Sequence, residues 1–265
     1  MVRVLLLLLV AYSLMASTLE DEIISIIGQE KFDQNRAILH AVFLKRDRYV
    51  QNEMVDISKV VQVLKRIGLI EEQFDRPTEQ TLLFRSFSEP NLFFKNAFDA
   101  MQKVDIFDYT VSQIKKSEEE YQIAFHYAST KIADPVAITR FLRKNGMNVV
   151  HLQKVDTRWE YTIAPTLPTI DAMKLDNKLY IKQIRKPIWI DVSRYQTLIF
   201  YPSPRNHWFA KIFIYDNHLY PLAVIKKDER VKKLTVQLPK GSYYIKISDI
   251  YTMKNMKYSL KIVGR

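Results

Sequence analysis

The sequence contains no cysteine and only five glycines in 265 residues. Without cysteine there is no disulfide, no thiolate nucleophile and no zinc–thiolate centre, so packing alone must stabilise the fold. The glycines stand apart from one another, and neither a G-x-G-x-x-G fingerprint nor a phosphate loop can be written. The common nucleotide-binding motifs are therefore excluded, and we expect no cofactor.

Familiar catalytic motifs are missing as well. The sequence has no G-x-S-x-G elbow and no H-E-x-x-H, and no two of its five histidines stand at the spacing that places metal ligands on one helix face. We therefore expect no metal site. Asp216 and Asp249 could flank a glycosidic bond as a pair of acids, but aspartates more often end strands in turns.

Long hydrophobic runs are confined to the N-terminus, where Val4–Ala16 is a run of 13 residues after the basic Arg3. Small residues and then the acidic Glu20 follow it, which is the pattern of a signal peptide over residues 1–17. The run is shorter than the about 20 residues that span a bilayer. We expect cleavage after Ala16 or Ser17 and an exported, periplasmic protein with no transmembrane segment afterwards; an uncleaved anchor is the alternative.

Acidic residues are fewer than basic ones, 29 against 40, which gives a formal net charge of +11. Positive charge favours anionic partners, and in the periplasm these would be an envelope protein or an anionic cell-wall polymer. Nucleic acid is not an expected partner in that compartment. The alternative is that the charge reflects only a lysine-rich proteome.

The region 18–76 has the periodicity of helices. Apolar residues recur at 57, 60, 61, 64 and 67, with a period of 3.6 residues, and predict a helix with one apolar face. Asp56 is placed to cap its start and Gly68 to end it. We expect residues 18–76 to form a helical N-terminal segment.

The region 77–165 contains the same predicted order of elements, strand, helix and strand, twice. The first copy consists of the strand "TEQTLLFRSF", a helix from Pro90 and the strand "DIFDYTVSQIKK". The second copy consists of the strand "EYQIAFHYAS", a helix from Asp134 and one long or bent strand, "MNVVHLQKVDTRWEYTIA". The order β-α-β-β-α-β predicts a ferredoxin-like, four-stranded antiparallel sheet with both helices on one face. On the less apolar side of the second copy's first strand, Gln122 and His126 are candidate partner-binding residues of the open face.

The prolines at 165 and 168 predict a boundary, with a linker over residues 166–176. From 177 to 265, short stretches alternate apolar and polar residues, and they predict an antiparallel β-sandwich. The overall fold class expected is α+β. The stretches "LPKGSYYIKIS" and "YSLKIV" resemble the closing strands of pre-peptidase C-terminal domains and related jelly-roll modules, which accompany exported enzymes and aid binding or secretion. The whole chain loosely resembles uncharacterised exported proteins of Campylobacter-type bacteria.

The stretch "YPSPRNHWFAKIFIYD" places Arg205, Asn206, His207 and Trp208 in a loop between two strands. Arginine binds anions with forked hydrogen bonds, and an indole ring stacks on flat or sugar-like groups. These four residues are therefore candidates for ligand or partner contact. The alternative is that Trp208 is a core residue and Arg205 covers its ring.

Taken together, these patterns favour a non-enzymatic binding or scaffolding protein of the periplasm. An accessory enzyme acting on peptidoglycan or glycan is the alternative, and it requires a cleft in which acids, or an acid and a histidine, converge. A third class, nucleic-acid handling, requires stacking aromatic residues on a sheet face and salt-sensitive binding. The oligomeric state is left open by the sequence.

Overall fold

The computed structural model divides the chain into two compact units, with the boundary between Thr169 and Ile170. Each unit is described by itself. The expected signal peptide, residues 1–17, lies outside the described residues. The structure describes residues 18–51, 53–87, 89–117, 120–164 and 166–265.

Short polar side chains cap the starts of three helices of the N-terminal unit, α2, α5 and α7. The Asp56 carboxylate accepts the N–H of Lys59 at 3.1 Å, and Asp134 accepts that of Val136 at 2.9 Å, which satisfies backbone donors of the first turn. Thr18 and Asp21 form a reciprocal capping box. The helices are α2 (Leu19–Ile27), α3 (Gln29–Gln34), α4 (Arg36–Val42), α5 (Ile57–Arg66), α6 (Pro90–Lys103) and α7 (Pro135–Lys144), with a 3₁₀ turn, η1 (Arg46–Arg48).

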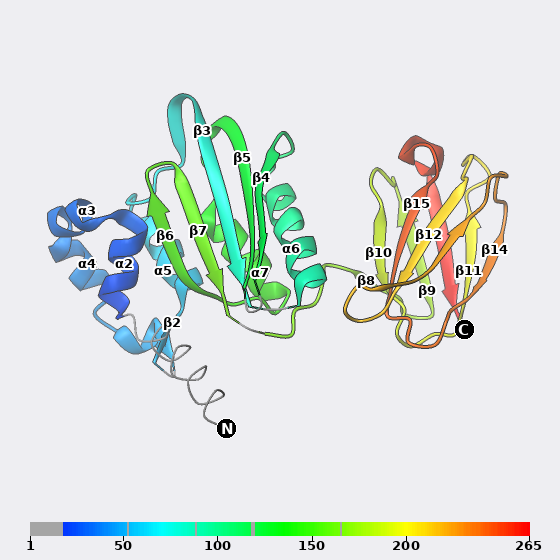
Figure 1. Ribbon diagram of the computed structural model, residues 1–265, viewed down its shortest axis with the longest axis horizontal. Coiled ribbons are helices and arrows are strands. Elements are labelled where there is room, and N and C mark those ends of the chain that lie inside the picture. Colours follow the sequence, from blue (N-terminus) through cyan, green and yellow to red (C-terminus); the bar gives the residue numbers. More distant parts are fainter. Residues whose placement is uncertain (1–17, 52, 88, 118–119, 165) are drawn as a thin grey trace. The chain divides into compact units, whose positions relative to one another are not determined.

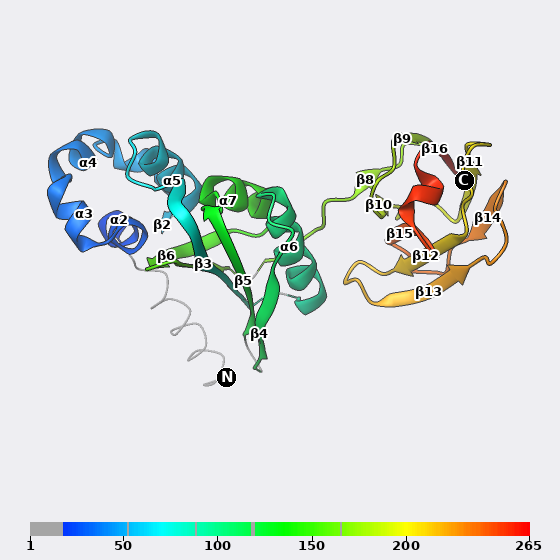
Figure 2. The same cartoon turned by 90° about the horizontal axis from the view of Figure 1, so that it is seen from above.

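A mixed sheet of five strands forms the centre of this unit (Figure 1). Figure 2 shows α6 and α7 on one side of it, and no helix of the described residues lies in front of its central strands on the other side. The strand order is β4-β5-β3-β7-β6, and only the pair β3 and β7 is parallel. The strands are β3 (Gln73–Ser86), β4 (Thr110–Lys116), β5 (Tyr121–Lys131), β6 (Val149–Val155) and β7 (Arg158–Ile163).

The last part of this sheet corrects the expected four-stranded antiparallel arrangement. The region expected to be one long strand is a hairpin, because Val155 pairs with Arg158 across a two-residue turn. Asp156 adopts a left-handed backbone with φ of 54°, which turns the chain back. Strand β7 then lies beside β3 and parallel to it, so the order is β-α-β-β-α-β-β. An Asp-Thr turn lacks the glycine that usually marks such a hairpin.

The helical segment expected at 18–76 is not separate from the sheet. Leu19 of α2 and Leu64 of α5 belong to the same hydrophobic cluster as Phe84 of β3 and Phe93 of α6. A hairpin of two short strands, β1 (Val50–Gln51) and β2 (Met54–Val55), lies between α4 and α5. One core thus stabilises the N-terminal unit, and the chain is described as two units rather than three.

The C-terminal unit consists of two sheets that share one hydrophobic core. Their orders are β13-β12-β15-β10-β8 and β14-β11-β16-β9, so the chain changes sheet at most connections. The strands are β8 (Met173–Lys174), β9 (Lys178–Lys182), β10 (Ile188–Asp191), β11 (Thr197–Pro202), β12 (Ala210–Tyr215), β13 (Pro221–Lys226), β14 (Leu234–Gln237), β15 (Tyr244–Asp249) and β16 (Ser259–Gly264), with a 3₁₀ turn, η2 (Met253–Met256).

The core of this unit follows the two-residue period of its strands. In β12, Ala210, Ile212 and Ile214 are wholly buried while the residues between them are only partly covered. Strand β8 and the buried Leu175 lie within the segment expected to be a linker, so part of 166–176 belongs to the folded unit. Across the part of the chain that is described, none of the helices has the length and apolarity needed to cross a membrane.

Candidate functional site

Trp208, a candidate for stacking on a ligand, lies in the core of the C-terminal unit. Its side chain is completely buried, its indole N–H donates to the carbonyl of Ser248 at 2.8 Å, and its ring centroid is 5.9 Å from that of Phe200. A buried indole with a satisfied N–H offers no face to a ligand at the surface. The stacking contact expected of Trp208 therefore cannot form.

The rest of the loop divides into one buried residue and two exposed ones. The Asn206 amide donates to the carbonyl of Ser259 at 2.8 Å and accepts the N–H of Tyr258 at 3.1 Å, which ties the loop to the start of β16. Arg205 and His207 are exposed. The Arg205 guanidinium lies 5.8 Å from the ring centroid of Tyr258 and does not cover the tryptophan. Only Arg205 and His207 are left to meet a partner.

His126 and Gln122 share the sheet face that lies opposite α6 and α7. His126 Nε2 is 2.8 Å from a carboxylate oxygen of Glu79. The Gln122 amide accepts from Gln113 at 3.0 Å and donates to Glu120 at 2.6 Å. Each side chain is bonded to its own neighbours, so the two candidates lie on one face without forming a joint site.

Other charges on this sheet face are paired as well. Glu160, whose side chain is only 11% exposed, accepts from Arg85 at 2.8 Å and also pairs with Arg158. At the β6 edge, His151 Nδ1 lies 3.0 Å from a carboxylate oxygen of Glu22 on α2. That hydrogen bond raises the pKa of His151, against the opposing effect of burial. Many charges of the open face are thus joined in pairs, whereas Lys115, directly opposite Gln122, is exposed.

The acids singled out as a possible catalytic pair do not converge. Asp249 pairs with Ala210 at the start of β12, whereas Asp216 follows the end of that strand. Six residues of strand separate them by roughly 20 Å, well beyond the roughly 5 to 10 Å of glycosidic cleavage. Asp216 accepts backbone N–H groups of the turn after it, and Asp249 does the same in its own turn. Both acids build turns.

Among residues whose positions the structure describes, no group of three histidine or acidic side chains could hold a metal ion.

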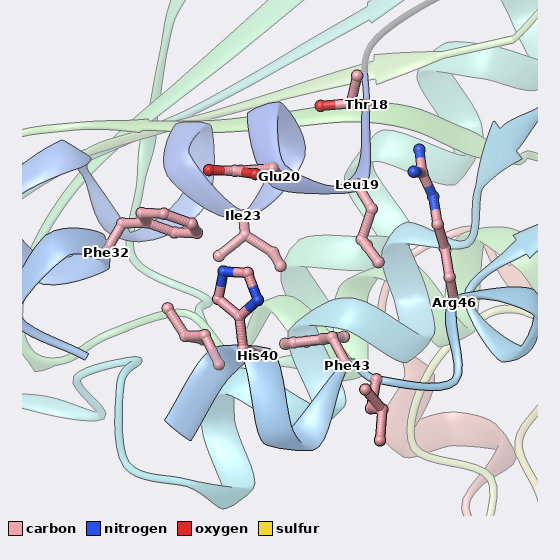
Figure 3. Close-up of a pocket in the computed structure, with 10 residues that line it drawn as sticks. Thr18, Leu19, Glu20, Ile23, Phe32, His40, Phe43 and Arg46 are labelled. Atoms are coloured by element: carbon pink, nitrogen blue, oxygen red, sulfur yellow. The ribbon is translucent and has the colours of Figure 1, made fainter. Parts of the chain in front are cut away.

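A pocket of about 410 Å³ between α2, α3 and α4 has an apolar floor that includes Ile23, Phe32 and Phe43. Figure 3 shows His40 pointing toward Ile23, with Glu20 and Arg46 farther out along the rim. This pocket offers apolar contact and no convergent acids.

The positive charge of the protein is concentrated in one unit. Residues 170–265 contain 14 lysines and 5 arginines against 6 aspartates and 1 glutamate, a net charge of +12. Residues 1–169 contain 21 basic and 22 acidic residues, a net charge of −1. The whole excess therefore lies in the C-terminal unit, whose electrostatic potential favours anionic partners.

A row of alternating aromatic and basic side chains crosses the outer face of the sheet β14-β11-β16-β9. Tyr201 and Tyr180 stand directly opposite Lys261 on its two sides. The Lys261 ammonium lies 5.5 Å from the Tyr201 ring centroid and 5.6 Å from that of Tyr180, and Lys233 lies 5.6 Å from Tyr201. We call these four residues the tyrosine–lysine row. Each contact is within the range of cation–π attraction.

Acidic residues are absent from the four strands that form this face, in sequences KLYIK, TLIFYP, LTVQ and SLKIVG. On β9, Lys178 and Lys182 are exposed on either side of Tyr180, which is itself 63% exposed. The charged residues of these four strands are therefore all positive. Its exposed tyrosine adds a ring face and a hydroxyl that can contact a ligand.

The outer face of the other sheet has a related but more covered group. The Trp189 and Tyr215 ring centroids are 5.2 Å apart, and the Lys246 ammonium lies 5.6 Å from Trp189. Lys211 lies 5.3 Å from the ring of Phe213. All three rings are only partly exposed. They pack mainly against one another, so the tyrosine–lysine row is the more accessible surface.

A scan against models of protein families finds no match for the chain, and a search of curated proteins finds none either. The resemblance to pre-peptidase C-terminal domains and to exported proteins of Campylobacter-type bacteria stays a prediction. Inferences about function therefore depend on the geometry and charge described above.

The tyrosine–lysine row was missed from the sequence, although a signal for it exists. Dividing the net charge at residue 170 separates a neutral part from a strongly basic one. Alternation within "KLYIK" places Lys178, Tyr180 and Lys182 on one strand face. The sequence pattern alone does not show the strand register that places Tyr180, Lys261 and Tyr201 side by side.

Proposed function

We propose that this is a non-enzymatic binding protein of the periplasm, whose C-terminal unit contacts an anionic cell-wall polymer through the tyrosine–lysine row. The observation that carries the proposal is the alternation of Tyr180, Lys261 and Tyr201 across three strands, continued by Lys233 just before β14, with no acid in any of the four strands. The net charge of +12 on the same unit supports it. An isolated basic residue would be much weaker support for a binding surface.

The rings give the row its binding geometry. A lysine ammonium held over an aromatic face loses little of its hydration and keeps N–H donors for an anion, at an attraction of about 0.5–1 kcal/mol per exposed contact. Lys261 is held by two rings, one on each side. Its ammonium is therefore placed over the sheet before a ligand arrives, which reduces the entropy lost on binding.

The length of the row favours a chain-like ligand over a small molecule. Four neighbouring strands at about 4.8 Å spacing give a strip of roughly 14 Å. Positive charge repeated along such a strip matches anionic groups repeated along a polymer. Attraction of this kind accelerates the encounter and weakens as salt increases.

We further propose that the C-terminal unit is a β-sandwich of the jelly-roll type. Its strands β9 to β16 alternate between sheets in the orders β9-β16-β11-β14 and β10-β15-β12-β13, which are those of an eight-stranded jelly roll. The N-terminal unit is proposed to be a ferredoxin-like variant, with the pattern β4-β5-β3 kept and a hairpin added at the edge. Loops and faces of such scaffolds commonly bind ligands.

The periplasmic location in this proposal depends on the leader-like sequence of residues 1–17 alone. The compartment is the reason for preferring a wall polymer to nucleic acid, which the same aromatic and basic side chains could also bind. A glycan-cleaving activity is an outcome of the test below.

The experiment is a binding titration of the full chain with polygalacturonate, a carboxylate polymer, at several salt concentrations. The double variant Lys233→Gln/Lys261→Gln removes two charges from the row. Its matched control, Lys240→Gln/Lys254→Gln, removes two charges from turns of the same unit that lie off this face. We expect the row variant to bind at least about tenfold more weakly, equal to about 1.4 kcal/mol, and the control to lose much less.

Four results would contradict the proposal. Equal weakening of both variants would mean that only net charge matters. Binding to neutral dextran with the same affinity would exclude charge recognition, and tighter binding to a single-stranded oligonucleotide would favour nucleic-acid handling. Release of reducing ends from the polymer would show an enzyme.

A further inference from the structure

A second candidate binding site lies in the C-terminal unit and does not involve the tyrosine–lysine row. It is a pocket of about 430 Å³ between the loop that follows β8 and the loop that follows β10. Leu175 is its only aliphatic lining residue. The chemistry comes from Lys174, Asp176, Asp191, Arg194, Tyr195 and Tyr243.

One wall of the pocket is fixed by Tyr195. Its hydroxyl donates to the carbonyl of Leu175 at 2.7 Å and accepts the N–H of Asn177 at 2.8 Å. Its ring lies so close to Gly264 that a Cβ at that position would be 2.4 Å from a ring carbon. The ring is therefore held at both ends, and this wall is formed before any ligand binds.

The second loop is fixed by Asp191. One of its carboxylate oxygens accepts the N–H of Ser193 at 3.0 Å and the hydroxyl of Ser193 at 2.7 Å. The N–H of Val192 donates to the carbonyl of Tyr243 at 2.8 Å. These bonds place Arg194 between two anchored residues, so its backbone position is defined.

The pocket is lined by two acids and two bases, which is unusual in a unit of such strong positive charge. Lys174, Asp176 and Arg194 are exposed, and within the described part of the chain no ion pair joins any of the four charges. A purely anionic ligand would meet two carboxylates here, and a purely cationic one would meet two bases. The complementary ligand has one charge of each sign.

We propose that this pocket binds a small zwitterion, an amino acid or short peptide whose ammonium and carboxylate groups are both free. Arg194 binds the carboxylate with its forked N–H donors, and Lys174 adds a second positive charge. Asp176 and the remaining carboxylate oxygen of Asp191 accept from the ammonium. The volume is near the lower end of the roughly 300–1,000 Å³ range of ligand pockets, which matches a small ligand.

The test is a calorimetric titration of the full chain with the dipeptide alanylalanine. Two blocked forms serve as matched probes, the N-acetyl dipeptide, which has no ammonium, and the dipeptide amide, which has no carboxylate. We expect the free dipeptide to bind and each blocked form to bind at least about tenfold more weakly, because each loses one charge-assisted contact. Galacturonate, an anion of similar size, tests whether one charge suffices.

Variants assign each contact to a residue. Arg194→Gln should abolish the preference for the free dipeptide over its amide, and Asp176→Asn should abolish the preference over the N-acetyl form. Arg185→Gln and Asp228→Asn are the controls, since they remove the same charges from exposed positions outside the pocket. Thermal unfolding of every variant checks that the unit is folded.

The proposal is overturned by equal binding of free and blocked dipeptides, by binding of galacturonate as tight as that of the dipeptide, or by no binding tighter than about 1 mM. Failure of this test leaves the polymer proposal standing, since the two use different residues and different probes.

Discussion

The two units differ in the balance of their charged residues. In the N-terminal unit the numbers of basic and acidic residues are almost equal, 21 and 22, and many are joined in pairs such as Lys65 with Asp134 at 2.9 Å. In the C-terminal unit basic residues outnumber acidic ones by 19 to 7, and lysines lie over tyrosine and tryptophan rings. Paired charges stabilise or orient their own unit, whereas an excess of one sign attracts a partner of the opposite sign.

Aromatic residues are both buried and exposed in each unit, and Phe107 of the N-terminal unit is 70% exposed. In the N-terminal unit Phe84, Phe125 and Tyr161 are wholly buried, and the ring centroids of Phe84 and Tyr161 are 5.0 Å apart. In the C-terminal unit Tyr180 is 63% exposed on an outer sheet face. Exposed rings therefore occur in both units, and the proposed binding surface is distinguished by the lysine that lies between Tyr180 and Tyr201.

The largest expected effect is on the free energy of unfolding, and it distinguishes Trp208, a core residue of the C-terminal unit, from Arg205, a surface residue of the same loop. Trp208→Ala should lower the free energy of unfolding by about 3–5 kcal/mol, because it empties a buried site and leaves the Ser248 carbonyl without its donor. Arg205→Ala should change it by less than about 0.5 kcal/mol. Denaturant unfolding monitored separately for each unit measures both, and similar values for the two variants would contradict the assignment.

The next effect tests the close contact of Gly264 with Tyr195. Gly264→Ala should destabilise the C-terminal unit by about 1–3 kcal/mol, because the new methyl group overlaps a ring that hydrogen bonds hold in place. Adding Tyr195→Ala removes the overlap. In a double-mutant cycle the two changes should therefore couple strongly. Additive effects would show that the ring moves aside freely.

The third effect concerns the ion pair between His151 and Glu22 in the N-terminal unit, and its dependence on pH. The pKa of His151 is raised by Glu22, so its stabilising effect is complete below the ordinary histidine pKa of about 6.5 and is lost as pH rises through the folded value. The unfolding free energy of wild type minus that of His151→Gln should therefore decrease with rising pH. A difference that is constant from about pH 6 to pH 9 would contradict this ion pair.

The smallest effect comes from an exposed bridge of the same unit. Glu71 bonds to Lys31 and to Lys154, and these contacts lower its pKa to about 2. Their stabilisation is present above about pH 4.5 and is lost as pH falls toward 2. Because the carboxylate is 46% exposed, Glu71→Gln should cost at most about 1 kcal/mol at neutral pH. At pH 2 the variant and wild type should be equally stable.

Several parts of the fold could be predicted because local chemistry determines them. Asp56, Asp134 and Pro90 mark helix starts in the sequence, and alternation identifies strands such as β12 and β15. The hairpin at Asp156 could not be predicted, because its turn depends on a left-handed aspartate without a neighbouring glycine.

The candidate site was harder to predict, for a physical reason. The sequence around Trp208 is compatible with a core residue and with an exposed residue that binds a ligand. Only the packing of the folded unit distinguishes the two. The tyrosine–lysine row is formed by residues up to 81 positions apart, Tyr180 and Lys261, which strand register brings together. Register of this kind depends on the whole sandwich and not on any single segment.

The most direct test of the account is a residue-level map of chemical-shift changes when the full chain is titrated with polygalacturonate. The account predicts that Tyr180, Tyr201 and Lys261 shift first and most, and that the shifts fade as salt is added. The open sheet face of the N-terminal unit, around His126 and Glu160, should stay unchanged. Primary shifts on that face, with the tyrosine–lysine row unaffected, would contradict it.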